Sequence, residues 1–427
     1  MGKNFLRKIG IVAANLLISA LVGMLLLDIV YLMPTTKMEI NASDAIFLFN
    51  SEGSHCGNDS HYVVQSITDN YSDSIILSNC FLRVLDAPFY KEALRDAYIS
   101  AENETGAFFP VEAYINYFSY AERFWGVYTY SRYWNGYQVI LIPLLQFFSY
   151  SKLRTLNLIL LVLLTAAASI CVYRKYSWRN FLAFLCMVFS LYPFYIYKTF
   201  QTSRIFNLTM LAVIAFCILK KEKRELLFLY VGIVIAYLDL FSYPCLAPGI
   251  LAVLTAIDMK EEKDNIKVIK TITAYMMLFV AGYIGMWLMK WLLSAVVLGP
   301  EIFTTVFEQV ALHTGGDVTF MMGFKNIFYL LSLIFMDYVV LLLVGAAVIA
   351  VVFGFTRGFN QRIWQDALLF GIMALMPVAL CLLIKGHACR HPFFDFRDFG
   401  ITVFALFSWL LNIPAWDKKI VNKNSLE

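Results

Sequence analysis

Charge is scarce in this chain of 427 residues: charged side chains make up 15% of it, whereas 60% of the residues are apolar. A soluble globular domain carries about 25% charged residues, so that class is excluded. Several apolar runs are about 20 residues long, which is enough to cross a hydrocarbon core about 30 Å thick. The sequence therefore predicts an all-α polytopic membrane protein.

The chain also lacks the patterns of a metal-binding or repeat protein. Its eight Cys form no CxxC pair and no Cys/His metal spacing, and it has no internal repeat. Cys56 and Cys80 share one polar loop and would pair only if that loop faces an oxidising compartment. The net charge of +4 comes mostly from Lys and Arg beside apolar runs, so it indicates no nucleic-acid partner.

Ten apolar segments are predicted as membrane spans. With both termini inside, every inside connection carries at least two Lys or Arg, as the positive-inside rule requires. The reverse orientation would place the basic segment KKEKRE outside. The predicted spans are 9–33, 154–172, 180–198, 204–219, 226–241, 243–257, 271–294, 326–353, 366–384 and 397–413.

This topology divides the chain into four parts. Residues 1–33 form the first transmembrane helix, 34–153 a large extracytoplasmic loop, 154–413 a nine-helix transmembrane domain and 414–427 a cytoplasmic tail. Interfacial helices are predicted over 62–84, over 86–100 and within 299–325, from helical spacing and start signals. The short run 137–148 contains Pro143 and is interpreted as a re-entrant or interfacial segment, because counting it as a span would reverse the charge pattern.

Besides residues at the very ends of the predicted spans, four ionisable residues fall inside them, all in the outward halves of their helices. Such groups are costly in a bilayer and usually functional. The alternative is that each extends its charged group to the interface or makes one structural ion pair. The four are Asp28, Asp239, Lys290 and Asp337.

Two carboxylates in TDNYSDS (68–74) are the first candidates for catalysis. Asp69 and Asp73 are four residues apart, which places them on one face of a helix, and His61 lies two turns upstream. Paired carboxylates divide general-base and metal-binding roles, because like charges push their pKa values apart. The alternative is a helix N-terminus capped by acids.

The stretch SRYWNGY (131–137) is the candidate for sugar binding. Arg132, Trp134 and Asn135 would combine an aromatic face with hydrogen-bonding groups, as a sugar or lipid-headgroup platform requires. The alternative is a belt of aromatic residues at the membrane interface.

Outward cations are the candidates for binding a phosphate. Arg offers a planar fork that matches phosphate oxygens, and Lys a point charge. The alternative is a surface loop that neutralises itself, because Asp395 and Asp398 lie among the cations of KGHACRHPFFDFRDFG (385–400). The set comprises Arg132, Arg154, Lys198, Arg204, Lys385, Arg390 and Arg397, with His387 and His391.

These features together resemble a family. One helix leading outward, a large outward loop with early acidic residues, interfacial helices and many further spans are similar to the GT-C superfamily of polyprenyl-phosphate-sugar-dependent glycosyltransferases. More locally, SRYWNGYQVILIPLL, SKLRTLN, the LFSYP turn and the His/Phe/Arg-rich segment before the last span look like a group of uncharacterised bacterial membrane proteins related to it.

The resemblance implies roles for particular residues. Asp69 and Asp73 would hold the acidic role, with a divalent cation such as Mg²⁺ or Mn²⁺. Asp44 and Asp28 are alternatives for the base, because the family's acidic residue follows the first helix closely. The donor phosphate would be bound by Arg154, Arg204, Arg390, His391 and Arg397, and the acceptor or sugar by His61, Arg132, Trp134 and Asn135.

The implied function is transfer of a sugar from a polyprenyl-phosphate donor to a glycan, lipid or protein of the cell envelope. It would take place at the outer face of the bacterial cytoplasmic membrane, in contact with membrane lipids. Two alternatives stay open: a transporter or flippase for lipid-linked glycans, and a polymerase of surface polysaccharide. A cluster of ionisable residues at the midplane or an inverted repeat would favour transport, and the sequence shows neither.

Overall fold

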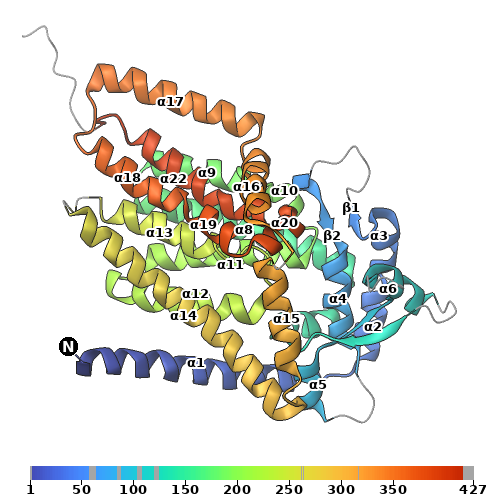
Figure 1. Ribbon diagram of the computed structural model, residues 1–427. Helices are drawn as coiled ribbons and strands as arrows, with labels where there is room; N and C mark the ends of the chain where they lie inside the picture. Colours follow the sequence, from blue (N-terminus) through green and yellow to red (C-terminus); the bar gives the residue numbers. More distant parts are fainter. Residues whose placement is uncertain are drawn as a thin grey trace, which may run out of the picture.

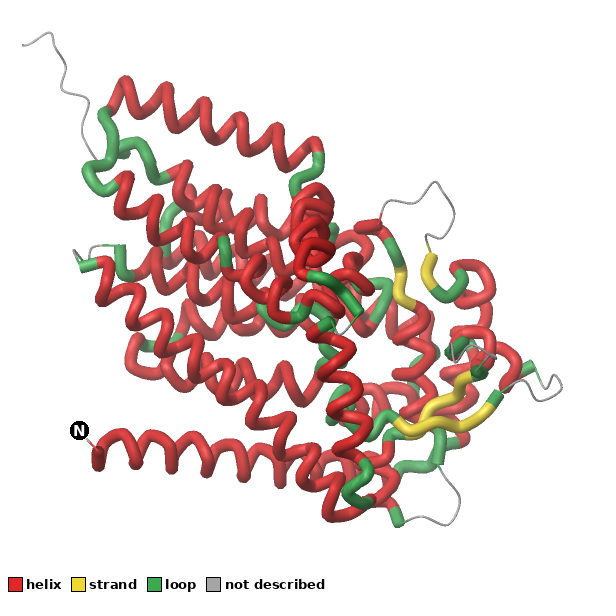
Figure 2. Tube along the Cα trace, viewed as in Figure 1, coloured by secondary structure: helices red, strands yellow, loops and turns green. Residues whose placement is uncertain are grey.

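The protein is described from a computed structural model. It covers residues 2–56, 64–83, 88–102, 108–119, 125–260, 262, 264–315 and 317–416, with the side chains of 2–5, 55 and 56 left out. The described chain is mostly helical, and long helices run side by side as a bundle (Figures 1 and 2). Four short strands lie together with short helices at one end of that bundle.

Six described helices are long and apolar enough to cross a membrane, which makes this a membrane protein. Their apolar side chains cover the outside of the bundle, as Leu163 and Leu341 do with 62% and 71% of their surface exposed. The six are α1 (Gly2–Tyr31), α8 (Tyr150–Lys175), α11 (Phe200–Ile218), α14 (Asn265–Leu298), α17 (Asp337–Arg357) and the pair α18 (Ile363–Ala374) and α19 (Met376–Leu383).

Four other predicted spans correspond to shorter helices that pack among these six. α9 packs against α22, and α12 packs along α14. That all ten predicted segments cross the membrane therefore remains a prediction. The four shorter helices are α9 (Trp178–Ser190), α12 (Arg224–Leu238), α13 (Leu246–Asp258) and α22 (Gly400–Leu411).

The single span predicted over 326–353 is wrong. Two helices occupy this region, α16 (Phe320–Ile334) and α17, and the break falls at Phe335–Met336. Asp337 is the first residue of α17, where a carboxylate interacts favourably with the helix dipole. α16 and the preceding α15 (Ile302–Thr314) run across the ends of neighbouring helices (Figure 1).

Two ends of the bundle can be distinguished. The basic end carries the start of α1 and the Lys- and Arg-containing connections 175–178, 219–224, 258–265 and 357–363. Ion pairs join these segments, with Lys8 Nζ 2.8 Å from Glu225 Oε1 and Arg224 Nη1 2.7 Å from Asp258 Oδ2. The described connections predicted to share one side of the membrane thus lie at one end.

The opposite end, here the loop end, carries residues 34–149. Its elements are the helices α2 (Thr36–Ser43), α3 (Ala45–Glu52), α4 (Asn70–Phe81), α5 (Phe89–Arg95), α6 (Pro110–Phe118) and α7 (Gln138–Leu145), the 3-10 turn η1 (Val64–Ser66), and the strands β1 (His55–Cys56), β2 (Thr68–Asp69), β3 (Ala97–Ser100) and β4 (Gly126–Thr129). β1 pairs antiparallel with β2, His55 opposite Asp69, and β3 pairs antiparallel with β4, Ala97 opposite Thr129.

The helices predicted here are shorter in the structure. The one expected over 62–84 begins at Asn70, because a 3-10 turn and a strand precede it, and the one expected over 86–100 ends at Arg95 before β3. α7 is an eight-residue helix containing Pro143, too short to span a bilayer, in agreement with the interpretation of 137–148. Cys80 is a buried free thiol, and the side chain of Cys56 lies outside the described part.

Close backbone contact joins α12 to α14. A Cβ built on Gly232 would lie 2.2 Å from Phe279 O, and one on Gly282 would lie 2.3 Å from Leu229 O. Small residues at reciprocal positions allow two membrane helices to approach this closely. Glycine is required at both positions.

Between α19 and α22 the chain folds into short helical pieces at the loop end: α20 (Lys385–Arg390), α21 (Pro392–Asp395) and η3 (Phe396–Phe399). They pack against α15 and α16 and against η1 of the first loop. The segment 385–400 and part of 34–153 are therefore neighbours.

Candidate functional site

Asp69 and Asp73 both occupy helix N-termini. Asp69 is the N-cap of α4, where its Oδ1 accepts a hydrogen bond from Ser72 N at 3.0 Å. Asp73 is fully buried and accepts hydrogen bonds from Tyr150 Oη at 2.6 Å and from the N–H groups of Phe200 and Gln201. The geometry is that of the capping alternative, and Asp73 fastens α4 to α8 and to the start of α11.

Burial decides the protonation behaviour of Asp73. It raises the pKa of this carboxyl to about 6, although the hydrogen bonds from Tyr150 and Phe200 act in the opposite direction. Asp44, the alternative base nearer to the first helix, likewise accepts a hydrogen bond from Ser151 N, in the first turn of α8, at 2.9 Å. Three acids of the first loop are thus engaged by helix N-termini.

Arg154, predicted to bind a donor phosphate, is held by groups of the protein. Its Nη1 and Nη2 lie 2.8 and 2.9 Å from the two carboxylate oxygens of Glu52, and Nη2 also donates to Asn70 Oδ1 at 2.8 Å. Such a bidentate pair is a strong charge-assisted contact. It joins α8 to α3 and α4.

The SRYWNGY segment is largely core. Trp134 is fully buried and donates through Nε1 to Met286 O at 2.7 Å, and Asn135 is fully buried with a positive φ of 51°. The Arg132 guanidinium lies over the rings of Tyr130 and Tyr133, 4.2 and 5.1 Å from their centroids. The structure separates Trp134 and Asn135 from any surface, and His61 lies outside the described residues.

The sequence identified Lys290 but not its partner. Lys290 Nζ lies 3.1 Å from Asp96 Oδ2 and 3.0 Å from Leu94 O, and both side chains are fully buried. Gln138 Nε2 donates to the other carboxylate oxygen of Asp96 at 2.7 Å. The structural ion pair expected for an ionisable residue inside a span is therefore found, and it joins α14 to the loop end.

Three histidines gather at the loop end. His387 Nδ1 lies 3.2 Å from His313 Nδ1, and the His387 and His391 ring centroids are 4.8 Å apart. Burial lowers the pKa of His387 well below its usual range, and burial near Arg132 and Arg390 lowers that of His313 to about 4. Both shifts favour neutral imidazoles, so these two rings add no positive charge at neutral pH.

Arg390 and Arg397 are engaged beside the histidines. Arg390 Nη2 lies 2.5 Å from Asp317 Oδ1, and its Nη1 donates to Leu312 O at 2.7 Å. Arg397 is buried, and its Nη groups donate to the backbone oxygens of Phe393 and, at 3.4 Å, Gln65. The contact with Gln65 brings the first loop and 385–400 together.

Two buried acids complete this cluster. Asp395 and Asp398 are fully buried. Within the described residues the carboxylate oxygens of Asp395 have no hydrogen-bond partner, and the ring nitrogen Nε2 of His387 lies 3.6 Å away. Burial raises the pKa of both carboxyls well above their usual range, which favours the protonated forms. Protonated acids do not balance Arg390 and Arg397, and no residue of 385–400 is exposed, so this segment matches neither a self-neutralised surface loop nor an open cationic site.

Arg204 differs from the other predicted phosphate-binding residues because it lines a groove. The groove has a volume of about 280 Å³ and lies between α7, α8, α11 and α12. Leu156, Leu160 and Leu164 line it from α8. Arg204, the fifth residue of α11, donates to Phe200 O and Gln201 Oε1 and lies 4.4 Å from the Tyr137 ring centroid. Its buried Nη1 has no partner in the described part of the chain.

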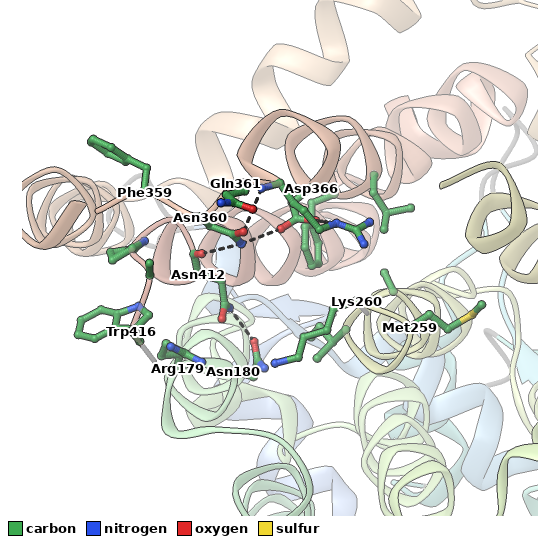
Figure 3. A pocket seen from close by; sticks show the side chains of 17 residues that line it. Arg179, Asn180, Met259, Lys260, Phe359, Asn360, Gln361, Asp366, Asn412 and Trp416 are labelled. Atoms are coloured by element: carbon green, nitrogen blue, oxygen red, sulfur yellow. Dashed lines mark hydrogen bonds and ion pairs between the residues drawn. The ribbon is translucent and has the colours of Figure 1, made fainter. Parts of the chain in front are cut away.

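A second and larger cavity lies at the basic end, where the sequence indicated no site. It has a volume of about 680 Å³ and is lined by residues from α9, α13, α18 and the segment after α22 (Figure 3). Arg179, Asn180, Lys260 and Asn360 point toward it (Figure 3). The residues that line it are far apart in the sequence, so no sequence motif indicates this cavity.

Metal ligands are not assembled in the described part of the chain. Among those residues, no three His, Cys, Asp or Glu side chains lie close enough together to hold a metal ion. Asp69 and Asp73, the predicted ligands, are occupied by helix N-terminal N–H groups.

Comparison with known proteins finds no matching family model, no similar curated protein and no similar solved structure. The functional argument therefore rests on the chain itself.

Proposed function

We propose that this protein binds a polyprenyl-phosphate-linked sugar at the loop end and transfers the sugar to a cell-envelope acceptor. The observation that carries the proposal is the apolar groove whose lining includes Arg204. Ile140, Leu160 and Leu211, each 47–55% exposed, line it and would contact an isoprenoid chain.

Arg204 supplies the charge that a lipid phosphate requires. It stands near the start of α11, and a guanidinium matches phosphate oxygens. The buried Nη1 without a described partner is a donor that a phosphate oxygen would satisfy. Phosphate held here is the leaving group of sugar transfer, and a fixed positive charge stabilises its developing negative charge.

Binding and transfer by the purified protein in neutral-lipid nanodiscs test the proposal. Arg204→Gln should weaken binding of a polyprenyl-phosphate analogue roughly tenfold or more, because a charge-assisted bond contributes about 1.5–3 kcal/mol. Arg204→Lys should recover part of the loss. Lys91→Gln, on α5 and outside the groove, is the charge-matched control.

The groove has its own matched pair of variants. Leu160→Trp fills it, whereas Leu163→Trp, on the same helix, adds the same ring on a surface that does not line it. Loss of binding in the first variant alone supports the lipid groove. Equal binding in all variants would remove this site from the proposal, and movement of the lipid-linked sugar across the bilayer without transfer would replace the transferase by a flippase.

A further inference from the structure

The cavity at the basic end has the composition of a binding site. Its volume of about 680 Å³ is within the range of about 300–1,000 Å³ typical of small-ligand sites. Its lining combines apolar side chains, such as Ile257, Leu369 and Phe370, with amides and cations, such as Asn180, Asn360 and Lys260. A ligand with both an anionic and an apolar part would match this mixed lining.

Arg362 and Asp366 do not supply the binding charge, because they neutralise each other. Arg362 Nε lies 3.9 Å from Asp366 Oδ1, while its Nη groups donate to Glu262 O at 2.5 Å and Asn265 Oδ1 at 2.9 Å. Asn360 Nδ2 also donates to Asp366 at 3.2 Å. Lys260 then adds a positive charge to the lining.

Lys260 and Asn180 direct donors to the same place. Asn412 Nδ2 donates to Asn180 Oδ1 at 3.1 Å, which fixes the amide so that Asn180 Nδ2 is turned away from Asn412. Lys260 extends toward Asn180 from the end of α13 (Figure 3). No carboxylate of the described chain lies within ion-pair distance of Lys260 Nζ, so two converging donors face space that an acceptor would fill.

A second cavity adjoins the first. It has a volume of about 610 Å³, shares Asn180, Ile257, Met259 and Lys260 with the first, and adds both cations and acids to the lining, with Lys221 3.3 Å from Asp258. Lys260 therefore stands where two open spaces of the same end meet.

We propose that the cavity at the basic end binds a phosphate group through Lys260 and Asn180, with the apolar side chains of the lining accepting the rest of the ligand. The phosphate belongs either to a lipid headgroup or to a soluble phosphate ester. This site lies at the opposite end of the bundle from Arg204 and does not depend on sugar transfer.

Two binding measurements on the full chain distinguish the sources. In neutral nanodiscs, calorimetry with inorganic diphosphate reports a soluble ligand, and native mass spectrometry with phosphatidic acid added to the disc reports a lipid headgroup. Lys260→Gln should weaken binding roughly tenfold in one of these measurements. Asn180→Asp, which places a carboxylate beside Lys260, should abolish it.

Lys270→Gln is the matched control, because this exposed lysine lies on the first turns of α14 and lines neither cavity. It removes the same charge from the same end and should leave binding unchanged. The proposal is overturned if neither probe binds the unaltered protein, or if Lys260→Gln and Lys270→Gln bind alike. Because Arg204 is unchanged in these variants, binding of the polyprenyl-phosphate analogue at the loop end is a separate readout.

Discussion

At the scale of single residues, the polar groups of the loop end mostly satisfy one another. Asp69 and Asp73 cap helices, Glu52 holds Arg154, and Asp96 holds Lys290. The sequence identified four of these six residues as unusual, and it offered the cap and the ion pair as alternatives. The sequence could not show which residues pair with each other, because Asp96 and Lys290 are separated by 194 positions and no local pattern connects them.

The buried carboxyl of Asp73 should make stability depend on pH. Its pKa is raised from 3.8 to about 6 on folding, so the folded protein binds the extra proton between these values. The stability that Asp73 contributes is then fully present below pH 3.8 and is lost as the pH rises through about 6, by at most about 3 kcal/mol. Asp73→Asn should remove this slope in thermal unfolding followed between about pH 4 and about pH 7.

Asp44→Asn provides the comparison for that experiment. Hydrogen bonds from Ser151 and Ser149 and nearby Lys152 hold the pKa of Asp44 below its ordinary value despite partial burial. Its contribution is therefore present above pH 3.8 and lost only at more acid pH. A slope that persists in Asp73→Asn, or that disappears in Asp44→Asn, would contradict the assignment.

At the scale of elements, the apolar runs in the sequence predicted most of the helices. The residues at which the helices end could not be read from these runs, because they depend on contacts with other parts of the fold. The run 326–353 is continuous in hydropathy, yet the helix is interrupted at Phe335–Met336, and Asp337 begins a new one. Similarly, residues 97–100 lie within the stretch predicted to be helical, but they form a strand because Gly126–Thr129 pairs with them. Tertiary partners override local propensity in both cases.

The contact of α12 with α14 gives a prediction at this scale. Gly232→Leu should destabilise the bundle by about 1–3 kcal/mol or more, because the new side chain meets the backbone at Phe279. Gly345→Leu on α17 is the matched control, since a Cβ there meets nothing within 4 Å. Unfolding of both variants in a detergent titration measures the difference in their stability. Equal stability would show that the close contact between α12 and α14 does not require glycine at position 232.

At the scale of the whole molecule, the basic end and the loop end predict an orientation. Lys and Arg concentrate in the connections of the basic end, so we predict from the positive-inside rule that this end faces the cytoplasm. In a background without the eight Cys, Glu301→Cys at the loop end should react with an impermeant thiol reagent in intact cells. Glu222→Cys at the basic end should react only after permeabilisation, and the reverse pattern would invert the topology.

The buried pair of Asp96 and Lys290 has a consequence for biosynthesis. Asp96 leaves the ribosome 194 residues before Lys290, so its counter-ion does not exist while the first loop is being synthesised. Removing one partner of a buried ion pair typically costs about 3–5 kcal/mol, and this cost disfavours burial of Asp96 before α14 is inserted. The loop end therefore completes its interior only after α14 arrives, late in translation.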